Sequence, residues 1–135
     1  MTIKVALAGA GAFGIKHLDG IKNIDGVEVV SLISRDLAKT QEVADKYGIK
    51  HVTTDLADSL AIKEVDAVIL CTPTQMHASQ SIACLEAGKH VQVEIPLCDE
   101  LRAGQEVARQ LIEAERDDET DRNRQRHHQR TQAWR

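Results

Sequence analysis

The sequence predicts an α/β fold with a doubly wound parallel sheet. Short apolar segments that are typical of strands alternate with segments whose apolar residues recur at helical spacing. A glycine-rich motif stands between the first strand segment and the first helix segment. Regular alternation of strand and helix indicates βαβ units, whose parallel sheet is covered by helices on both faces. Right-handed crossovers then make the doubly wound arrangement the simplest topology.

Each element has its own signal in the sequence. The run IKVALA near the N-terminus and the β-branched run VEVVSLI predict the first two strands. Asp36 can cap the second helix, and Gly48 and Gly88 can end two of the helices. The predicted strands are 3–8, 27–33, 51–52, 66–71 and 90–93, and the predicted helices are 12–24, 37–47, 55–61, 75–87 and 99–114.

The composition changes sharply after residue 114. Residues 115–135 contain 6 arginines, 5 acidic residues and only 2 apolar residues, too few to form a core. We therefore expect residues 1–114 to form one domain and residues 115–135 to be a polar, arginine-rich tail that extends the last helix or is disordered. Within that last helix we expect four residues to face inward: Leu101, Val107, Ala108 and Leu111.

Composition and charge exclude several classes of protein. The chain has no apolar run of about 18 residues, so we expect no membrane partner. Aromatic residues are only 2% of the chain, and the acidic residues of the tail nearly cancel its arginines, so we expect no nucleic-acid partner. The three cysteines, Cys71, Cys84 and Cys98, fit neither a disulfide framework nor a zinc motif. These features, with an N-terminus unlike a secretory signal, indicate a cytoplasmic protein with reduced thiols.

The segment GAGAFG at 9–14 predicts a phosphate-binding loop. It has the form G-x-G-x-x-G, follows a strand and opens a helix, which is the context that a dinucleotide-binding (Rossmann) fold requires. Gly9 permits a tight turn, Gly11 lets the backbone approach a pyrophosphate, and Gly14 lets helix and strand pack closely. The alternative is a glycine-rich turn of another α/β fold, such as a flavodoxin-like one. The candidate residues are Gly9, Ala10, Gly11, Ala12, Phe13 and Gly14.

The end of the second strand indicates which dinucleotide binds. NAD-binding folds carry an acidic residue roughly 20 residues beyond the glycine motif, where it bonds the ribose hydroxyl. Ser34 and Arg35 stand there, and a guanidinium suits the 2′-phosphate of NADP. We therefore expect NADP, with NAD as the alternative. Asp36 follows, either as the cap of the next helix or as a ribose contact.

Residues after the fourth strand are expected to border the nicotinamide half of the cofactor, because ligands bind beyond the carboxyl ends of parallel strands. The segment CTPTQMH supplies Cys71, Thr72, Pro73 and His77. Pro73 lacks an N–H and fixes the turn. His77 falls in the first turn of the next helix, where it either borders the cofactor or covers apolar surface.

The segment QVEIP after the fifth strand supplies Glu94 and Pro96 to the same region. A carboxylate at a buried strand end needs a partner, either a ribose hydroxyl or the N–H groups of a nearby helix. His17, His51 and His90 are interpreted as structural or surface residues, since none shares a motif with a second polar group. We expect no metal site and no Ser–His–Asp triad.

The chain resembles the glucose–fructose oxidoreductase and inositol dehydrogenase (Gfo/Idh/MocA) family over residues 1–113. The likeness rests on GAGAFG at 9–14, CTPTQMH at 71–77, AGKHVQVEIP at 87–96 and their spacing. The family has an N-terminal dinucleotide-binding domain and a larger α+β domain that binds substrate and often mediates oligomers. The resemblance implies that the glycine loop, residues 34–35 and the two later segments contact the cofactor.

Two departures from the family pattern bear on activity. Ile95 stands where the family has a lysine that contacts substrate and manages a proton, so the resemblance supplies no catalytic residue. The tail replaces the start of the substrate domain, and we expect a truncated chain that lacks this domain. A small-molecule substrate would then need a second domain, and a homo-oligomer stays open. The alternative is a non-catalytic module that binds nucleotides or senses redox state and acts through a protein partner.

Overall fold

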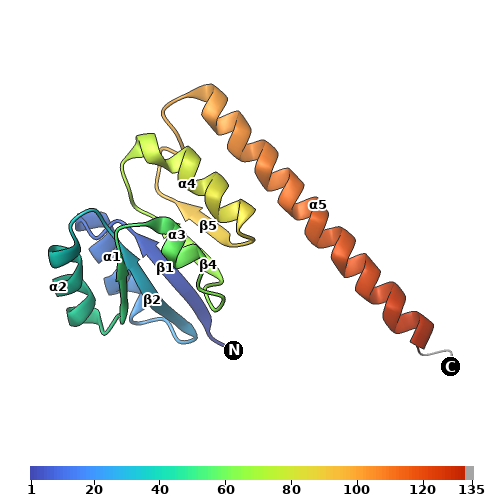
Figure 1. Ribbon diagram of the computed structural model, residues 1–135, viewed down its shortest axis with the longest axis horizontal. Helices are drawn as coiled ribbons and strands as arrows, with labels where there is room; N and C mark the ends of the chain where they lie inside the picture. Colours follow the sequence, from blue (N-terminus) through green and yellow to red (C-terminus); the bar gives the residue numbers. More distant parts are fainter. Residues whose placement is uncertain (133–135) are drawn as a thin grey trace.

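A computed structural model describes residues 1–132, with side chains described for residues 1–118. Five parallel strands form one sheet in the order β3-β2-β1-β4-β5 (Figure 1), which confirms the predicted doubly wound fold. The elements are β1 (Ile3–Ala8), α1 (Ala12–Ile21), β2 (Val27–Ile33), α2 (Leu37–Tyr47), β3 (His51–Thr53), α3 (Leu56–Leu60), β4 (Ala67–Leu70), α4 (Thr74–Glu86), β5 (His90–Val93) and α5 (Leu101–Gln132).

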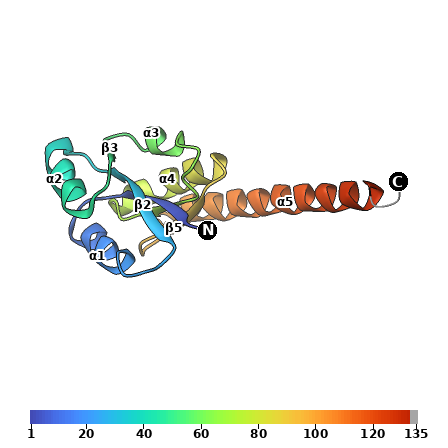
Figure 2. The same cartoon turned by 90° about the horizontal axis from the view of Figure 1, so that it is seen from below.

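Successive residues of the central strand β1 point into two different cores. Leu7 joins a cluster with Leu18 of α1 and Ala44 of α2. Ala8 joins a cluster on the opposite face, with Cys84 of α4. Side chains alternate along a strand, so a strand that is apolar at every position is covered on both faces. Figure 2 shows the sheet between α1 on one side and α3 and α4 on the other.

The carboxyl ends of the strands are aligned by backbone hydrogen bonds just beyond the strands themselves. The N–H of Gly9 donates to Ile33 O at 2.8 Å, and the N–H of Cys71 donates to Ala8 O at 2.7 Å. The N–H of Glu94 likewise donates to Leu70 O at 3.0 Å. The segments that follow β1, β2, β4 and β5 therefore lie side by side at one edge of the sheet.

Helix α1 is shorter than the sequence predicted, because it ends at Ile21 rather than at 24. The side chain of Asn23 donates to Asp19 O at 3.1 Å, and the N–H of Asn23 bonds Gly20 O, so the last turn closes locally. Ile24 then lies in the loop with 53% of its surface exposed. The predicted end of this helix at residue 24 was therefore wrong.

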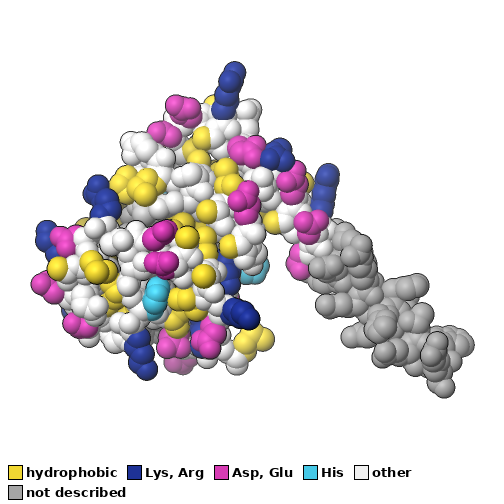
Figure 3. All heavy atoms as spheres, in the orientation of Figure 1, with side chains coloured by type: hydrophobic (Ala, Val, Ile, Leu, Met, Phe, Trp, Pro, Cys, Tyr) yellow, Lys and Arg dark blue, Asp and Glu magenta, His cyan; other side chains and the backbone are white. Residues whose placement is uncertain are grey.

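Helix α5 differs most from the prediction. Val107 is buried against the rest of the chain, but the prediction was wrong for the other three residues, since Leu101, Ala108 and Leu111 are exposed. The helix packs on α4 and then leaves the body of the molecule (Figures 1 and 3), so most of its circumference has nothing to pack against in the described part of the chain.

The same helix continues far beyond the expected boundary at 114. It extends to Gln132, while residues 133–135 lie outside the described part. One feature of the sequence supports the continuation past 114, since there is no glycine or proline between 105 and 132. Before that boundary, Arg109 pairs with Glu106 at 2.6 Å and with Glu113 at 2.5 Å, at spacings that stabilise helices.

Among the described residues, no helix is both long enough and apolar enough to cross a bilayer.

The cysteine environments predict an order of thiol modification. Cys84 is completely buried, and burial raises the pKa of its thiol to about 11, whereas Cys98 is only half-buried. Because the thiolate is the reactive form, we expect an alkylating reagent at pH 8 to modify Cys98 first and Cys84 only when the chain unfolds. Mass spectrometry of labelled peptides over time measures both sites, and early label at Cys84 would contradict the packing described here.

Candidate functional site

The glycine motif forms a tight connection between β1 and α1. Gly9 has a φ of +107°, and a Cβ there would lie 2.5 Å from Cys71 O. A Cβ on Gly14 would lie 1.8 Å from Gly9 O, so only glycine lets the helix pack this closely. Around Gly11 the position of a Cβ is open space. No side chain caps the N-terminus of α1, so its first N–H groups are available to an anion.

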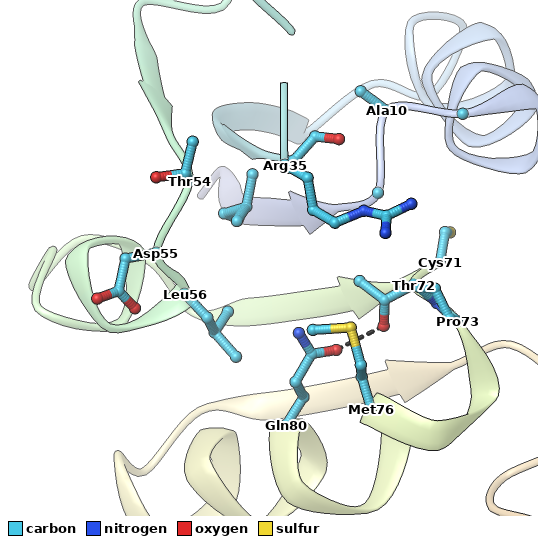
Figure 4. A pocket seen from close by; sticks show the side chains of 14 residues that line it. Ala10, Arg35, Thr54, Asp55, Leu56, Cys71, Thr72, Pro73, Met76 and Gln80 are labelled. Atoms are coloured by element: carbon cyan, nitrogen blue, oxygen red, sulfur yellow. Dashed lines mark hydrogen bonds between the residues drawn. The ribbon is translucent and has the colours of Figure 1, made fainter. Parts of the chain in front are cut away.

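A cavity of about 420 Å³ lies beside this loop, at the carboxyl edge of the sheet (Figure 4). Eight of the predicted cofactor-binding residues line it: Gly9, Ala10, Gly11, Ser34, Arg35, Cys71, Thr72 and Pro73. The strands β1, β2 and β4 bring these residues together from three separate parts of the sequence. The fold therefore places the glycine loop, the Ser34–Arg35 pair and the Thr72–Pro73 turn around one space.

The other predicted residues do not line the cavity: Ala12, Phe13, Gly14, His77, Glu94 and Pro96. The cavity also has lining residues that the sequence analysis did not single out: Ile33, Thr54, Asp55, Leu56, Met76 and Gln80. The segment 54–56 follows β3, which pairs with β2, so the rule that ligands bind beyond parallel strand ends could have found it. Gln80 accepts a hydrogen bond from the Thr72 hydroxyl at 2.5 Å.

Arg35 and Asp36 are adjacent in the sequence, but their side chains lie in different surroundings. The Arg35 side chain reaches from the end of β2 across the cavity (Figure 4). The Asp36 carboxylate instead accepts the backbone N–H of Lys39 at 3.1 Å and caps α2, as the cap interpretation predicted. The carboxylate of Asp55, which lines the cavity, accepts the N–H of Ala57 at 2.9 Å and caps α3. Both carboxylates are thus held by helix N-termini.

His77 lies beneath the cavity rather than in it. It is 2% exposed, with Nε2 at 2.7 Å from Thr72 O and Nδ1 at 2.9 Å from Pro96 O. Carbonyl oxygens only accept, so the ring satisfies both when each nitrogen carries a proton. Neither expected role of His77, bordering the cofactor or covering apolar surface, describes these two contacts. His77 ties the segment after β4 to the segment after β5.

Glu94 has a partner within the chain that the sequence analysis did not foresee. Its Oε1 lies 2.6 Å from Nε2 of His17 on α1, with the two side chains 29% and 24% exposed. The expected partners were a ribose hydroxyl or helix N–H groups. Cys71 lies close by, and burial, followed by the Glu94 charge, raises the pKa of its thiol to about 11. These three residues are 54 and 23 positions apart in sequence, so no local motif reveals them.

Comparison with known proteins identifies the family. Residues 3–117 match an oxidoreductase family with an NAD-binding Rossmann fold, known as GFO/IDH/MocA. The chain belongs to this family. The resemblance inferred from the glycine loop and the two later segments is therefore confirmed, and the fold is that of the family's dinucleotide-binding domain.

Individual relatives place the chain within the GFO/IDH/MocA family. It is 71% identical to 4-carboxy-2-hydroxymuconate-6-semialdehyde dehydrogenase of a Sphingobium species over 97 residues, which are 72% of this chain and 31% of that enzyme. It is 41% identical to inositol 2-dehydrogenase of Rhodococcus erythropolis over 96 residues, 70% of this chain and 28% of the relative. The structure of the WlbA dehydrogenase from Chromobacterium violaceum with NADH and UDP-GlcNAcA matches with a TM-score of 0.79 and 32% identity, over 84% of this chain and 33% of that one. The chain thus spans about a third of these relatives.

Ile95, which stands where the family resemblance predicts a lysine, is exposed to solvent. Ile95 is 90% exposed and precedes Pro96 through a cis peptide bond. An isoleucine side chain carries neither a charge nor an exchangeable proton. The exposed position is therefore open to a ligand or a second domain but offers no acid–base group.

The glycine geometry predicts contrasting effects of two substitutions. Gly14→Ala places a methyl group against Gly9 O, so we expect it to lower the free energy of unfolding by about 2 kcal/mol or more. Gly11→Ala meets open space and is expected to change stability by less than about 1 kcal/mol. Urea unfolding followed by circular dichroism measures both, and equal losses would contradict the close packing at Gly14.

The buried histidine predicts a second stability effect. His77→Leu removes both ring nitrogens from the carbonyls of Thr72 and Pro96, and each buried carbonyl that loses a donor costs about 1–3 kcal/mol. We expect His77→Gln to recover part of the loss, because one amide can reach one carbonyl. The same urea unfolding experiment measures both variants, and a His77→Leu chain as stable as the wild type would show that the two hydrogen bonds contribute nothing.

Proposed function

We propose that this chain is the cofactor domain of a dehydrogenase and that it binds NADP in preference to NAD. The observation that supports the preference for NADP is the different placement of two adjacent side chains, those of Arg35 and Asp36. The guanidinium lies at the cavity, whereas the carboxylate that would favour a ribose hydroxyl caps a helix. A 2′-phosphate is recognised by a guanidinium through paired hydrogen bonds and charge.

The residues around the cavity suit each part of a dinucleotide. The open space at Gly11 and the uncapped N-terminus of α1 suit the pyrophosphate. In this proposal Ser34 and Arg35 hold the phosphate on the adenosine ribose, and the Thr72–Pro73 turn lines the same cavity. When bound, the nicotinamide ring accepts or donates a hydride. The chain itself orients the cofactor.

The similarity to the Sphingobium enzyme suggests the substrate class. We infer that the whole protein oxidises the cyclic hemiacetal of 4-carboxy-2-hydroxymuconate-6-semialdehyde to 2-pyrone-4,6-dicarboxylate, in the breakdown of aromatic compounds. In that oxidation the hemiacetal carbon loses a hydride and its hydroxyl loses a proton. Ile95 cannot accept the proton, so in this proposal the base comes from the part of the protein that corresponds to the two thirds of the relatives outside this chain.

Calorimetric titration with NADP⁺ and NAD⁺ tests the cofactor proposal. We expect Arg35→Ala to weaken NADP⁺ binding about 10- to 100-fold, because a hydrogen bond to a charged group contributes about 1.5–3 kcal/mol, and to leave NAD⁺ binding unchanged. Arg109→Ala, which removes an arginine that pairs with acidic residues on α5, is the matched control and should change neither. Equal affinity for both dinucleotides in the wild type would contradict the NADP preference. Absence of binding to either would contradict the proposed role of the cavity.

A further inference from the structure

Three potential metal ligands from distant parts of the sequence meet at the edge of the cavity. His17 on α1, Cys71 after β4 and Glu94 after β5 each present one ligand atom, and the three atoms lie within 4.8 Å of one another. All three residues are half-buried. Among the residues that the structure describes, these three form the one group of histidine, cysteine and acidic side chains whose ligand atoms lie close enough together to hold a metal ion.

The donor atoms indicate which metal would bind. An imidazole nitrogen, a thiolate sulfur and a carboxylate oxygen are the three ligand types that zinc uses in proteins. Magnesium and calcium prefer oxygen ligands alone, so the cysteine and histidine disfavour them. Sites with three protein ligands leave a fourth position open to water or another molecule. We propose that His17, Cys71 and Glu94 form a binding site for one zinc ion.

The geometry needs only a small adjustment to accept the ion. Two ligands of a tetrahedral zinc are separated by about 3.5 Å, given metal–ligand distances of about 2.0–2.3 Å. His17 Nε2 and Glu94 Oε1 are 2.6 Å apart, so this pair has to open by about 1 Å. Both side chains are partly exposed and can move by rotation about their own bonds. Cys71 is fixed by its backbone N–H, which donates to Ala8 O at 2.7 Å, and provides the anchor.

The electrostatics of the cluster also suit a cation. The negative charge of Glu94 acts directly on the Cys71 sulfur. Lys16 is the basic residue next to His17 in the sequence, and its ammonium group lies 5.2 Å from the centre of the Phe13 ring. A divalent ion between the thiolate and the carboxylate would compensate both charges, and the thiol proton would be released to solvent as the metal–sulfur bond forms.

Metal binding to the full chain, without any dinucleotide, tests the site directly. The purified protein is stripped with a chelator under reducing conditions and then titrated with Zn²⁺ in competition with a chromophoric chelator. We expect one Zn²⁺ per chain and affinity about a hundredfold weaker in Cys71→Ser and in His17→Gln, since loss of even an indirect partner of a zinc ligand costs about 10- to 100-fold. Cys98→Ser is the matched control and should bind as the wild type does.

Two further measurements separate this site from other sources of zinc binding. Co²⁺ in place of Zn²⁺ should give a thiolate-to-metal absorption band that Cys71→Ser removes and Cys98→Ser retains. A His127→Gln/His128→Gln variant removes the adjacent histidine pair of the sequence and should bind Zn²⁺ normally. Circular dichroism verifies that each variant is folded, and Cys71→Ala replaces the serine variant if that one is not.

Three results would overturn the proposal: no stoichiometric Zn²⁺ binding, equal affinity in folded Cys71 variants, or loss of binding with the His127–His128 pair. Because no NADP is present in these titrations, they neither depend on the proposed cofactor role nor fail with it.

Discussion

The contact between Gly14 and the carbonyl of Gly9 is the constraint on which the rest of the structure depends. With no side chain at position 14, α1 lies directly on the end of β1, and the helix N-terminus is brought to the carboxyl edge of the sheet. Gly9 in turn lies against the backbone of Cys71, so the loop after β1 is also packed on the segment after β4. The cavity, with its anion-attracting helix end, follows from these two close approaches.

The strands and the doubly wound class of the fold could be predicted from the sequence because the relevant signals are local. Runs such as IKVALA and VEVVSLI are apolar at nearly every position, and the glycine motif lies between the first strand and the first helix. Helix α5 shows the limit of this reasoning. Its apolar residues, among them Leu101 and Leu111, have helical spacing, but spacing predicts burial only where another element covers that face, and α4 covers only one part of it.

The candidate site was predictable where neighbours in sequence are neighbours in space. Residues 9–11 of the glycine loop, the Ser34–Arg35 pair and the Thr72–Pro73 turn all line the cavity. Contacts between segments could not be predicted. His17 and Glu94 are 77 positions apart, and His77 and Pro96 are 19 apart, so their pairing depends on the relative placement of strands and helices. Buried polar groups need hydrogen-bond partners, but the sequence alone does not show which residues supply them.

The position of His77 has a mechanical consequence. One rigid ring connects the turn at Thr72 to the cis-proline segment at Pro96 through bonds of 2.7 and 2.9 Å. The ring is closely surrounded, since only 2% of the residue is exposed, so it has little room to rotate. A displacement of either segment would therefore stretch one of these two contacts, so the position of Pro96, next to the exposed Ile95, is coupled to that of Thr72 at the cavity.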